Sequence, residues 1–251
     1  ISGNDTKQKR AGKIYQPGRA YQRVLDLLYP PVCPFCGRIS SEGICSDCRK
    51  KLPYIREQGC MHCGKPLREE TDEYCPDCRN RKSYIRQGRS VWLHSGSVPG
   101  AVYRFKYQNR RRYGRIFAEE MAGCCGGMLR KWEINEIIPI PLHSSRKRMR
   151  GYNQAEILAS ELSFLTGIPV RKDVLLRIRK TQPQKQLDDR ERRQNLRGAF
   201  AVAKGWNPCR NALLIDDIYT TGSTVERSAK MLRKAGCENV YFLTISIGQG
   251  L

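Results

Sequence analysis

Residues 212–224 have the sequence ALLIDDIYTTGST, in which four apolar residues lead into two adjacent acids and then a loop of threonine, glycine and serine. The apolar residues predict a buried strand, and the acids would follow at its carboxyl end, where open α/β sheets bind ligands. Small loop residues let backbone N–H groups approach an anion, and a helix predicted at about 223–235 adds the positive end of its dipole. The stretch therefore predicts a phosphate site; the alternative is a capped strand-turn-helix with two solvated aspartates.

The segments around this stretch predict strands that alternate with helices. Apolar runs predict strands at 89–94, 137–142, 174–178, 199–202 and 240–247, and apolar residues at helical spacing predict helices around 98–105, 116–129 and 153–166. In the last of these helices, Ile157, Leu158, Leu162 and Leu165 are expected to face inward. Strands alternating with helices indicate an α/β fold, a mainly parallel sheet flanked by helices.

Eight of the twelve cysteines form four Cys-x-x-Cys pairs ahead of these elements. The pairs are Cys33/Cys36, Cys45/Cys48, Cys60/Cys63 and Cys75/Cys78. Two residues between thiolates allow one tight turn to present both sulfurs to a single ion, whereas such neighbours make poor structural disulfides. We therefore predict two structural zinc ions that use all eight thiolates and leave no open position for catalysis.

The sequence leaves open which four cysteines share an ion. Sequential ribbons, 33–48 and 60–78, compete with an interleaved cross-brace, and the loops of 8 and 11 residues between the pairs favour the sequential arrangement. His62 lies inside a complete pair, so a ligand role for it is not favoured. The other cysteines, expected to be small core residues, are Cys124, Cys125, Cys209 and Cys237.

Composition is that of a soluble globular protein. The 251 residues, 39% of them apolar and 28% charged, can bury a core in one medium domain or two smaller ones. We find no run of roughly 20 apolar residues and no apolar signal segment, which favours a cytoplasmic protein. We expect a loose leader at 1–17, a region at 18–82 made of a short helix near 21–28 and a double zinc ribbon, and the α/β domain at 83–251.

Positive charge dominates the chain, because 46 basic residues against 24 acidic ones give a net charge of +22. Such a field attracts polyanions. The densest cluster is RFKYQNRRRYGR at 104–115, and a second basic run is RKRMR at 146–150. Aromatic residues suited to stacking on single-stranded bases alternate with the first cluster, namely Tyr103, Phe105, Tyr107 and Tyr113. The alternative for the first cluster is that Phe105 is buried, as the helical periodicity indicates, and that the arginines are only solvated; the alternative for the second run is a solvated basic surface.

The string at 212–224 resembles the signature of type I phosphoribosyltransferases, which bind phosphoribosyl pyrophosphate (PRPP). Two further segments look like the ComF family of competence-associated phosphoribosyltransferase-like proteins, whose members carry an N-terminal double zinc ribbon. They are PLHSSRKRMRGYNQ at 141–154 and the spaced set Arg177, Thr181, Gln184, Leu187, Arg192, Asn195 and Phe200. The resemblance covers about residues 20–248.

This resemblance implies a site for PRPP and Mg²⁺. Asp216 and Asp217 would hold the ribose hydroxyls, and the 5′-phosphate would be cradled by Thr220, Thr221, Gly222, Ser223 and Thr224. Arg146 and Arg150 lie where other phosphoribosyltransferases place the pyrophosphate loop. Arg177 and Arg192 belong to a polar segment, 177–197, expected to close over the site and exclude water. Mg²⁺ would bridge pyrophosphate and ribose oxygens.

The implied chemistry is displacement of pyrophosphate from the ribose anomeric carbon, promoted by charge and positioning. No general base for an incoming nucleophile stands out, so the acceptor and turnover itself stay open. We do not expect glutamine-dependent chemistry, because an N-terminal nucleophilic cysteine is lacking. An alternative of another class is a non-catalytic single-stranded-DNA-binding protein of the transformation machinery that retains only the ligand site.

Overall fold

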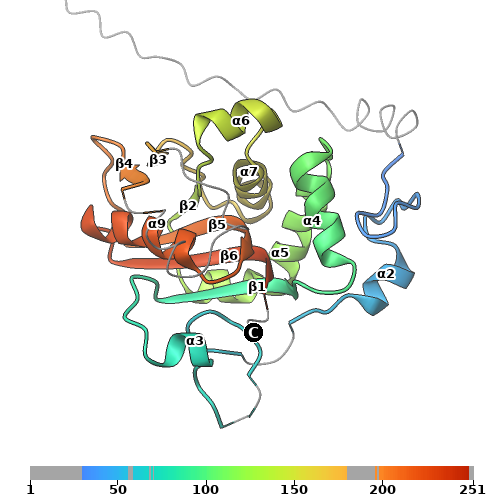
Figure 1. Cartoon of the computed structure of the whole chain (residues 1–251), viewed down its shortest axis with the longest axis horizontal. Coiled ribbons are helices and arrows are strands. Elements are labelled where there is room, and N and C mark those ends of the chain that lie inside the picture. Colours follow the sequence, from blue (N-terminus) through green and yellow to red (C-terminus); the bar gives the residue numbers. More distant parts are fainter. Residues whose placement is uncertain are drawn as a thin grey trace, which may run out of the picture.

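The computed structural model describes residues 30–55, 59–67, 69, 71–179, 196 and 198–248 (Figure 1). Its elements are α2 (Ser46–Lys51), α3 (Pro76–Arg79), β1 (Gln87–Leu93), α4 (Val98–Tyr107), α5 (Tyr113–Lys131), β2 (Glu136–Pro139), α6 (Ser144–Arg150), α7 (Gln154–Thr166), β3 (Leu175–Arg177), β4 (Phe200–Val202), β5 (Asn211–Tyr219), α9 (Ser223–Lys234) and β6 (Asn239–Ile247). The expected leader and the helix near 21–28 lie outside the described residues.

Four parallel strands form the central sheet in the order β1-β6-β5-β2. β5 and β6 run side by side from the pair Asn211 and Asn239 to the pair Tyr219 and Ile247. The expected strands at 174–178 and 199–202 exist as β3 and β4, but they form a separate antiparallel pair. The predicted fold class, a mainly parallel α/β sheet flanked by helices, is confirmed (Figure 1).

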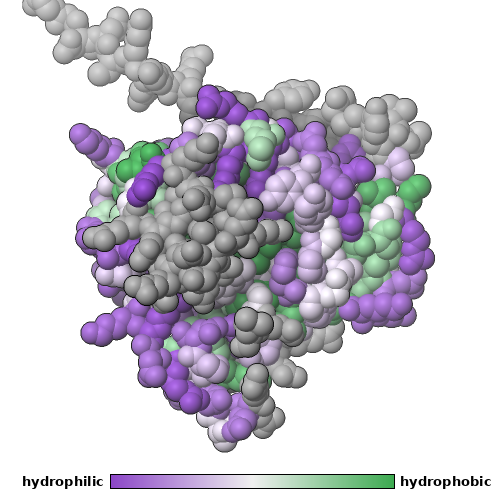
Figure 2. All heavy atoms as spheres, in the orientation of Figure 1, coloured by the Kyte–Doolittle hydropathy of each residue, from purple (hydrophilic) through white to green (hydrophobic). Residues whose placement is uncertain are grey.

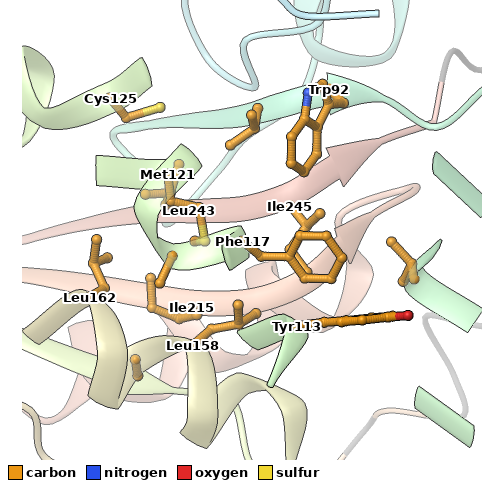
Figure 3. Close-up of a cluster of buried hydrophobic side chains, with 14 of the residues drawn as sticks. Trp92, Tyr113, Phe117, Met121, Cys125, Leu158, Leu162, Ile215, Leu243 and Ile245 are labelled. Atoms are coloured by element: carbon orange, nitrogen blue, oxygen red, sulfur yellow. The ribbon is translucent and has the colours of Figure 1, made fainter. Parts of the chain in front are cut away.

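Alternation along the central strands sends side chains to two cores, one on each face of the sheet. Leu213 and Ile215 of β5 pack with residues of α4, α5 and α7, whereas Ala212 and Leu214 pack with residues of α9. Figure 3 shows the first of these cores, with Phe117 of α5 close to Ile245 of β6. Because both faces of β5 are covered, its apolar residues form a continuous run.

The helices bury most of the residues that helical spacing predicts. In α4, Val98, Ala101, Val102 and Phe105 are all buried. Leu158 and Leu162 of α7 are buried as well, but Leu165 is 42% exposed, so its predicted inward position is wrong. The reason is local, because α7 ends one residue later and Gly167, with φ at 75°, turns the chain away.

The two groups of cysteines dock on opposite faces of the sheet. Cys33 and Phe35 belong to the core that contains Trp92, and the Phe35 ring meets the Trp92 ring edge-on at 5.4 Å between centroids. The second group, from Cys60 to Cys78, belongs to the core that contains α9. In Figure 1 the helices of the two groups, α2 and α3, accordingly lie at separate sites.

The four remaining cysteines differ in burial. Cys125 and Cys237 are buried, as predicted, and Cys209 is partly buried. Cys124 is exposed, so the core position expected for it is wrong. Neighbouring residues of an α-helix point about 100° apart, and on α5 only Cys125 of this pair faces the core.

One face of the molecule is largely hydrophilic (Figure 2). Figure 2 shows polar side chains over much of the face in view, with apolar residues confined to small areas. Among the described residues, no helix combines the length and apolar character needed to cross a membrane.

Candidate functional site

Each group of four cysteines gathers its sulfurs around one point. The groups are Cys33, Cys36, Cys45 and Cys48, and Cys60, Cys63, Cys75 and Cys78; within each, the four Sγ atoms lie within 4.8 Å of one another. Tetrahedral zinc with Zn–S bonds of about 2.3 Å requires sulfurs about 3.8 Å apart. The Sγ atoms of Cys36 and Cys45 are 3.7 Å apart, as are those of Cys63 and Cys75. The residues therefore fit two structural zinc ions, and the cysteines are grouped sequentially.

His62 lies beside the second group without joining it. Its side chain is 9% exposed, and Nε2 has no hydrogen-bond partner among the described residues. Burial lowers the pKa of the imidazole, which favours the neutral form. Four thiolates already complete the group, in agreement with the expectation that His62 is not a ligand.

The twin acids lie within β5 rather than beyond it. Asp216 pairs in register with Thr244 of β6, and parallel pairing continues as far as Tyr219 and Ile247. The backbone N–H of Asp217 donates to Oδ1 of Asp216 over 2.9 Å. The strand therefore ends two residues after the acids, and the loop that begins with Thr220 is correspondingly short.

The loop turns sharply into α9 at Gly222. This residue has φ at 73°, and a Cβ atom there would collide with the Tyr219 ring, so that glycine is required on two counts. The Gly222 carbonyl accepts the first helical hydrogen bond, from the Glu226 N–H at 2.8 Å. The preceding N–H groups of α9 have no acceptor within the helix. They are placed to serve a phosphate, and Thr224 and the buried Ser223 occupy this same turn.

A lysine that the sequence assigned to a basic surface points into this site. Nζ of Lys106 lies 2.9 Å from Oδ2 of Asp217, and both side chains are largely buried, at 15% and 13% exposure. Lys106 follows Val102 by one helical turn on α4, which places it on the edge of the inward face. This helical spacing could have predicted an inward-facing lysine. The many arginines nearby favoured a surface assignment instead.

Asp216 holds its proton unusually well. Burial raises the pKa of this carboxyl to about 7, with a further contribution from the neighbouring Asp217, while Lys106 and Arg177 act in the opposite direction. The site therefore contains an acid whose charge changes near neutral pH.

This shift predicts how stability depends on pH. Between about pH 4 and 7 the native protein holds a proton on Asp216 that the unfolded chain has released, so this carboxyl makes the free energy of unfolding fall as pH rises. In the variant Asp216→Asn this contribution is absent. From pH 5 to pH 8, we expect the free energy of unfolding of the variant to rise by at least about 1 kcal/mol relative to that of the wild type, as measured by urea unfolding. If the free energies of unfolding of the variant and the wild type differed by the same amount at pH 5 and pH 8, the prediction would be contradicted.

Of the four predicted arginines, Arg177 lies close enough to Asp216 for their charges to interact, and Arg146 lies beside Arg177. Arg177 of β3 has a pKa lowered to about 10, first by burial and then by Arg146, while Asp216 raises it. Burial and the charge of Arg150 lower the pKa of Arg146. The fourth residue, Arg192, lies outside the described residues, as does most of the segment expected to close over the site.

Residues 146–150 form a helix, α6, rather than a loop. Arg146 and Arg150 are one helical turn apart and are both half-buried, whereas Lys147 binds Glu156 of α7 at 2.8 Å. Arg150 donates through Nη2 to the Tyr107 hydroxyl at 2.9 Å and covers the Tyr107 ring. Its buried Nε has no hydrogen-bond partner in the described part of the chain.

Several side chains of the basic cluster at 104–115 make contacts within the protein. Arg104 donates to the carbonyl of Pro34 at 2.7 Å and so holds the first cysteine group, and Arg115 binds Glu119 at 3.0 Å. Of the aromatic residues expected to stack on bases, Phe105 and Tyr113 are buried, so that role is wrong for both; they fill the core instead. Tyr103 and Tyr107 are exposed, with ring centroids 4.9 Å apart.

Comparisons with known proteins place the chain in a family. The double zinc ribbon domain family matches residues 24–79. The chain is also 33% identical over 210 residues to Competence protein F of Haemophilus influenzae, a match that covers 80% of this chain and 89% of that protein. The chain belongs to the ComF family. The ComF resemblance recognised in the sequence is thereby confirmed.

Other relatives of this ComF protein carry names linked to competence or to DNA. It is 29% identical over 199 residues to Competence protein ComFC of Bacillus subtilis, covering 78% of this chain and 80% of that one. It is 28% identical over 230 residues to DNA utilization protein YhgH of Salmonella typhimurium, covering 85% and 96%.

Solved phosphoribosyltransferase structures are also among the matches, at low similarity. The Bacillus subtilis glutamine PRPP amidotransferase is 22% identical with a TM-score of 0.34, covering 54% of this chain and 26% of that one. An adenine phosphoribosyltransferase is 14% identical with a TM-score of 0.33, covering 51% and 69%.

Proposed function

We propose that this ComF protein binds PRPP with Mg²⁺ at the carboxyl end of β5 and acts on the bond between its ribose and pyrophosphate. One observation carries the proposal: the paired acids have cations from two separate elements beside them, Lys106 of α4 on Asp217 and Arg177 of β3 near Asp216, and Arg146 of α6 adds its charge beside Arg177. Burial first, and then a neighbouring arginine charge, lower the pKa values of Arg146 and Arg177, and a bound polyanion would relieve the repulsion between these charges. PRPP supplies both the phosphate charge for the cations and the hydroxyls for the acids.

The protein groups have complementary roles in this proposal. Asp216 and Asp217 accept hydrogen bonds from the ribose hydroxyls, and the N–H groups that open α9 bind the 5′-phosphate. Arg146 and Arg177 face the pyrophosphate, where guanidinium groups can donate pairs of hydrogen bonds to phosphate oxygens. Nε of Arg150, which has no hydrogen-bond partner among the described residues, is a further donor on α6.

Magnesium suits the same site. Mg²⁺ prefers oxygen ligands, which two adjacent carboxylates and the phosphate oxygens provide, and it would neutralise charge on the departing pyrophosphate. Lys106 must share Asp217 with these groups, since its ammonium already lies 2.9 Å from that carboxylate.

Calorimetry with PRPP and Mg²⁺ tests the binding, and an assay for released pyrophosphate tests the chemistry. We expect saturable heat with one PRPP per chain. Pyrophosphate release, measured with nucleobases and amines offered separately as acceptors, then separates a transferase from a protein that only binds. The proposal fails if no heat is detected at millimolar PRPP with the zinc content intact.

We propose a second function, binding of single-stranded DNA, on the strength of one exposed feature. The rings of Tyr103 and Tyr107 lie next to each other, tilted by 41°, and the guanidinium of Arg150 covers the Tyr107 ring at 4.5 Å from its centroid. Exposed aromatic rings bordered by arginine are the surface on which unpaired bases stack. The net charge of +22 and the relatives named for competence and DNA utilization support the same function.

Affinity for a single-stranded oligonucleotide should fall steeply as salt rises, because lysine and arginine side chains that bind the phosphates release counterions from the strand. Replacing Tyr103 and Tyr107 by alanine should weaken binding about tenfold or more, since a stacked base contributes roughly 1–3 kcal/mol. Tyr74→Ala, at a tyrosine 39% exposed in the second cysteine group, is the matched control and should bind as the wild type does. A flat plot of log affinity against log salt would exclude this function.

A further inference from the structure

The segment that follows the second cysteine group touches the phosphate loop directly. Nη1 of Arg81 donates to the backbone carbonyl of Thr221 over 2.8 Å, across 140 positions of sequence. Thr221 precedes Gly222, the residue that turns the loop into α9. A side chain from the zinc-ribbon region is therefore part of the support of the proposed PRPP site.

The position of Arg81 depends on the second cysteine group. The N–H of Arg81 donates to the carbonyl of Cys78 at 3.2 Å, and the N–H of Cys78 donates to the carbonyl of Cys75 at 2.9 Å. Two of the four sulfurs thus belong to the turn that leads into Arg81. An ion held by these sulfurs would fix the turn, and with it the base of the arginine side chain.

A second contact ties the same segment to the first turn of α9. The Glu226 carboxylate accepts from the Ser83 hydroxyl at 2.8 Å and from the Tyr84 backbone N–H at 2.7 Å. The Tyr84 ring also lies under the ammonium of Lys230, 5.4 Å from the ring centroid. Residues 81–84 therefore hold both the loop and the helix that follows it.

Backbone geometry links this contact to ligand binding. The peptide between Thr221 and Gly222 is trans, so the Thr221 carbonyl and the Gly222 N–H point in opposite directions. While Arg81 holds the carbonyl on one side, the N–H is turned to the other side. Rotation of this peptide would exchange a donor for an acceptor, and an acceptor repels phosphate.

We infer that the second zinc site sets the conformation of the phosphate loop through Arg81, a positioning residue that acts on the Thr221 carbonyl. The identity of the ligand rests on the proposed function, whereas the effect on the loop does not. PRPP affinity is then coupled to metal occupancy at Cys60, Cys63, Cys75 and Cys78, and not to occupancy of the first group.

The test compares Arg81→Ala, Arg81→Lys and Lys82→Ala, with zinc content measured for each. Lys82 is exposed and adjacent, so its variant removes the same charge without touching the loop. In Arg81→Ala we expect at least tenfold faster amide hydrogen exchange at 220–225 without ligand, and at least tenfold weaker PRPP binding. Arg81→Lys, which keeps a donor for the carbonyl, should recover part of both, and Lys82→Ala should match the wild type.

Two further variants distinguish the outcomes. Cys78→Ser should lose one zinc ion and show the same faster amide exchange at 220–225. Glu226→Gln, which keeps the contact of Arg81 with the Thr221 carbonyl, should increase this exchange less. Wild-type exchange rates at 220–225 in both Arg81→Ala and Cys78→Ser would overturn the inference. If the wild type does not bind PRPP, the proposed function fails, and exchange alone then decides the role of Arg81.

Discussion

PRPP binding is expected to disappear when either twin acid is replaced by its amide, in Asp216→Asn or Asp217→Asn. Each carboxylate would accept hydrogen bonds from ribose hydroxyls, and bonds to a charged group contribute roughly 1.5–3 kcal/mol each. Losing two of them costs about 3 kcal/mol or more, roughly a hundredfold in affinity. Asp217→Asn should have the additional effect of leaving the Lys106 ammonium without its partner at 2.9 Å. Calorimetry with PRPP and Mg²⁺ measures the loss.

The matched control is Asp47→Asn, because Asp47 is an exposed acid bound to Arg38 at 2.7 Å in the first cysteine group. This variant should bind PRPP as the wild type does. Melting temperature and zinc content confirm that each variant is folded before affinity is compared. An Asp217→Asn protein that keeps its zinc and binds PRPP with unchanged affinity would show that the acids do not hold the sugar.

Removal of zinc is expected to open the first core as well as the cysteine groups. We expect two zinc ions per chain, and a strong chelator should release both. A structural zinc ion contributes roughly 10 kcal/mol or more at neutral pH, which is comparable to the whole stability of a domain. Since Phe35 of the first group covers Trp92, loss of metal should lower the melting temperature and shift tryptophan emission to longer wavelength.

The variant Trp92→Phe identifies the source of this shift. Trp92 is completely buried in the structure, so its replacement should remove most of the change in emission while zinc release stays the same. Complete loss of both ions with unchanged emission and melting temperature would contradict the prediction. Added zinc should restore both properties.

The sequence predicted the fold well where a local residue pattern was compatible with only one kind of secondary structure. The run at 212–215 could only be a buried strand, and the helical spacing of Val98, Ala101, Val102 and Phe105 matches the face that α4 buries. The Cys-x-x-Cys pairs predicted the two cysteine groups because a tight turn determines where both sulfurs point.

Features that depend on distant parts of the chain were not predictable in this way. Helical spacing places Lys106 at the edge of the inward face of α4, but it does not show that the ammonium binds Asp217 on a distant strand. The contact of Arg81 with Thr221 joins residues 140 positions apart, and no spacing rule reports it. For the same reason, the adjoining cysteine groups gave no sign that they dock on opposite faces of the sheet.

The order of the strands has a consequence for synthesis of the protein. Among the strands that the structure describes, β1 leaves the ribosome first, and its pairing partner in the sheet is β6, about 150 positions later in the register. Pairing over such a separation is slow, because a long loop must close before any contact forms. We expect the nascent chain to carry β1 unpaired through most of translation, a period in which its exposed edge is open to aggregation or to protection by chaperones.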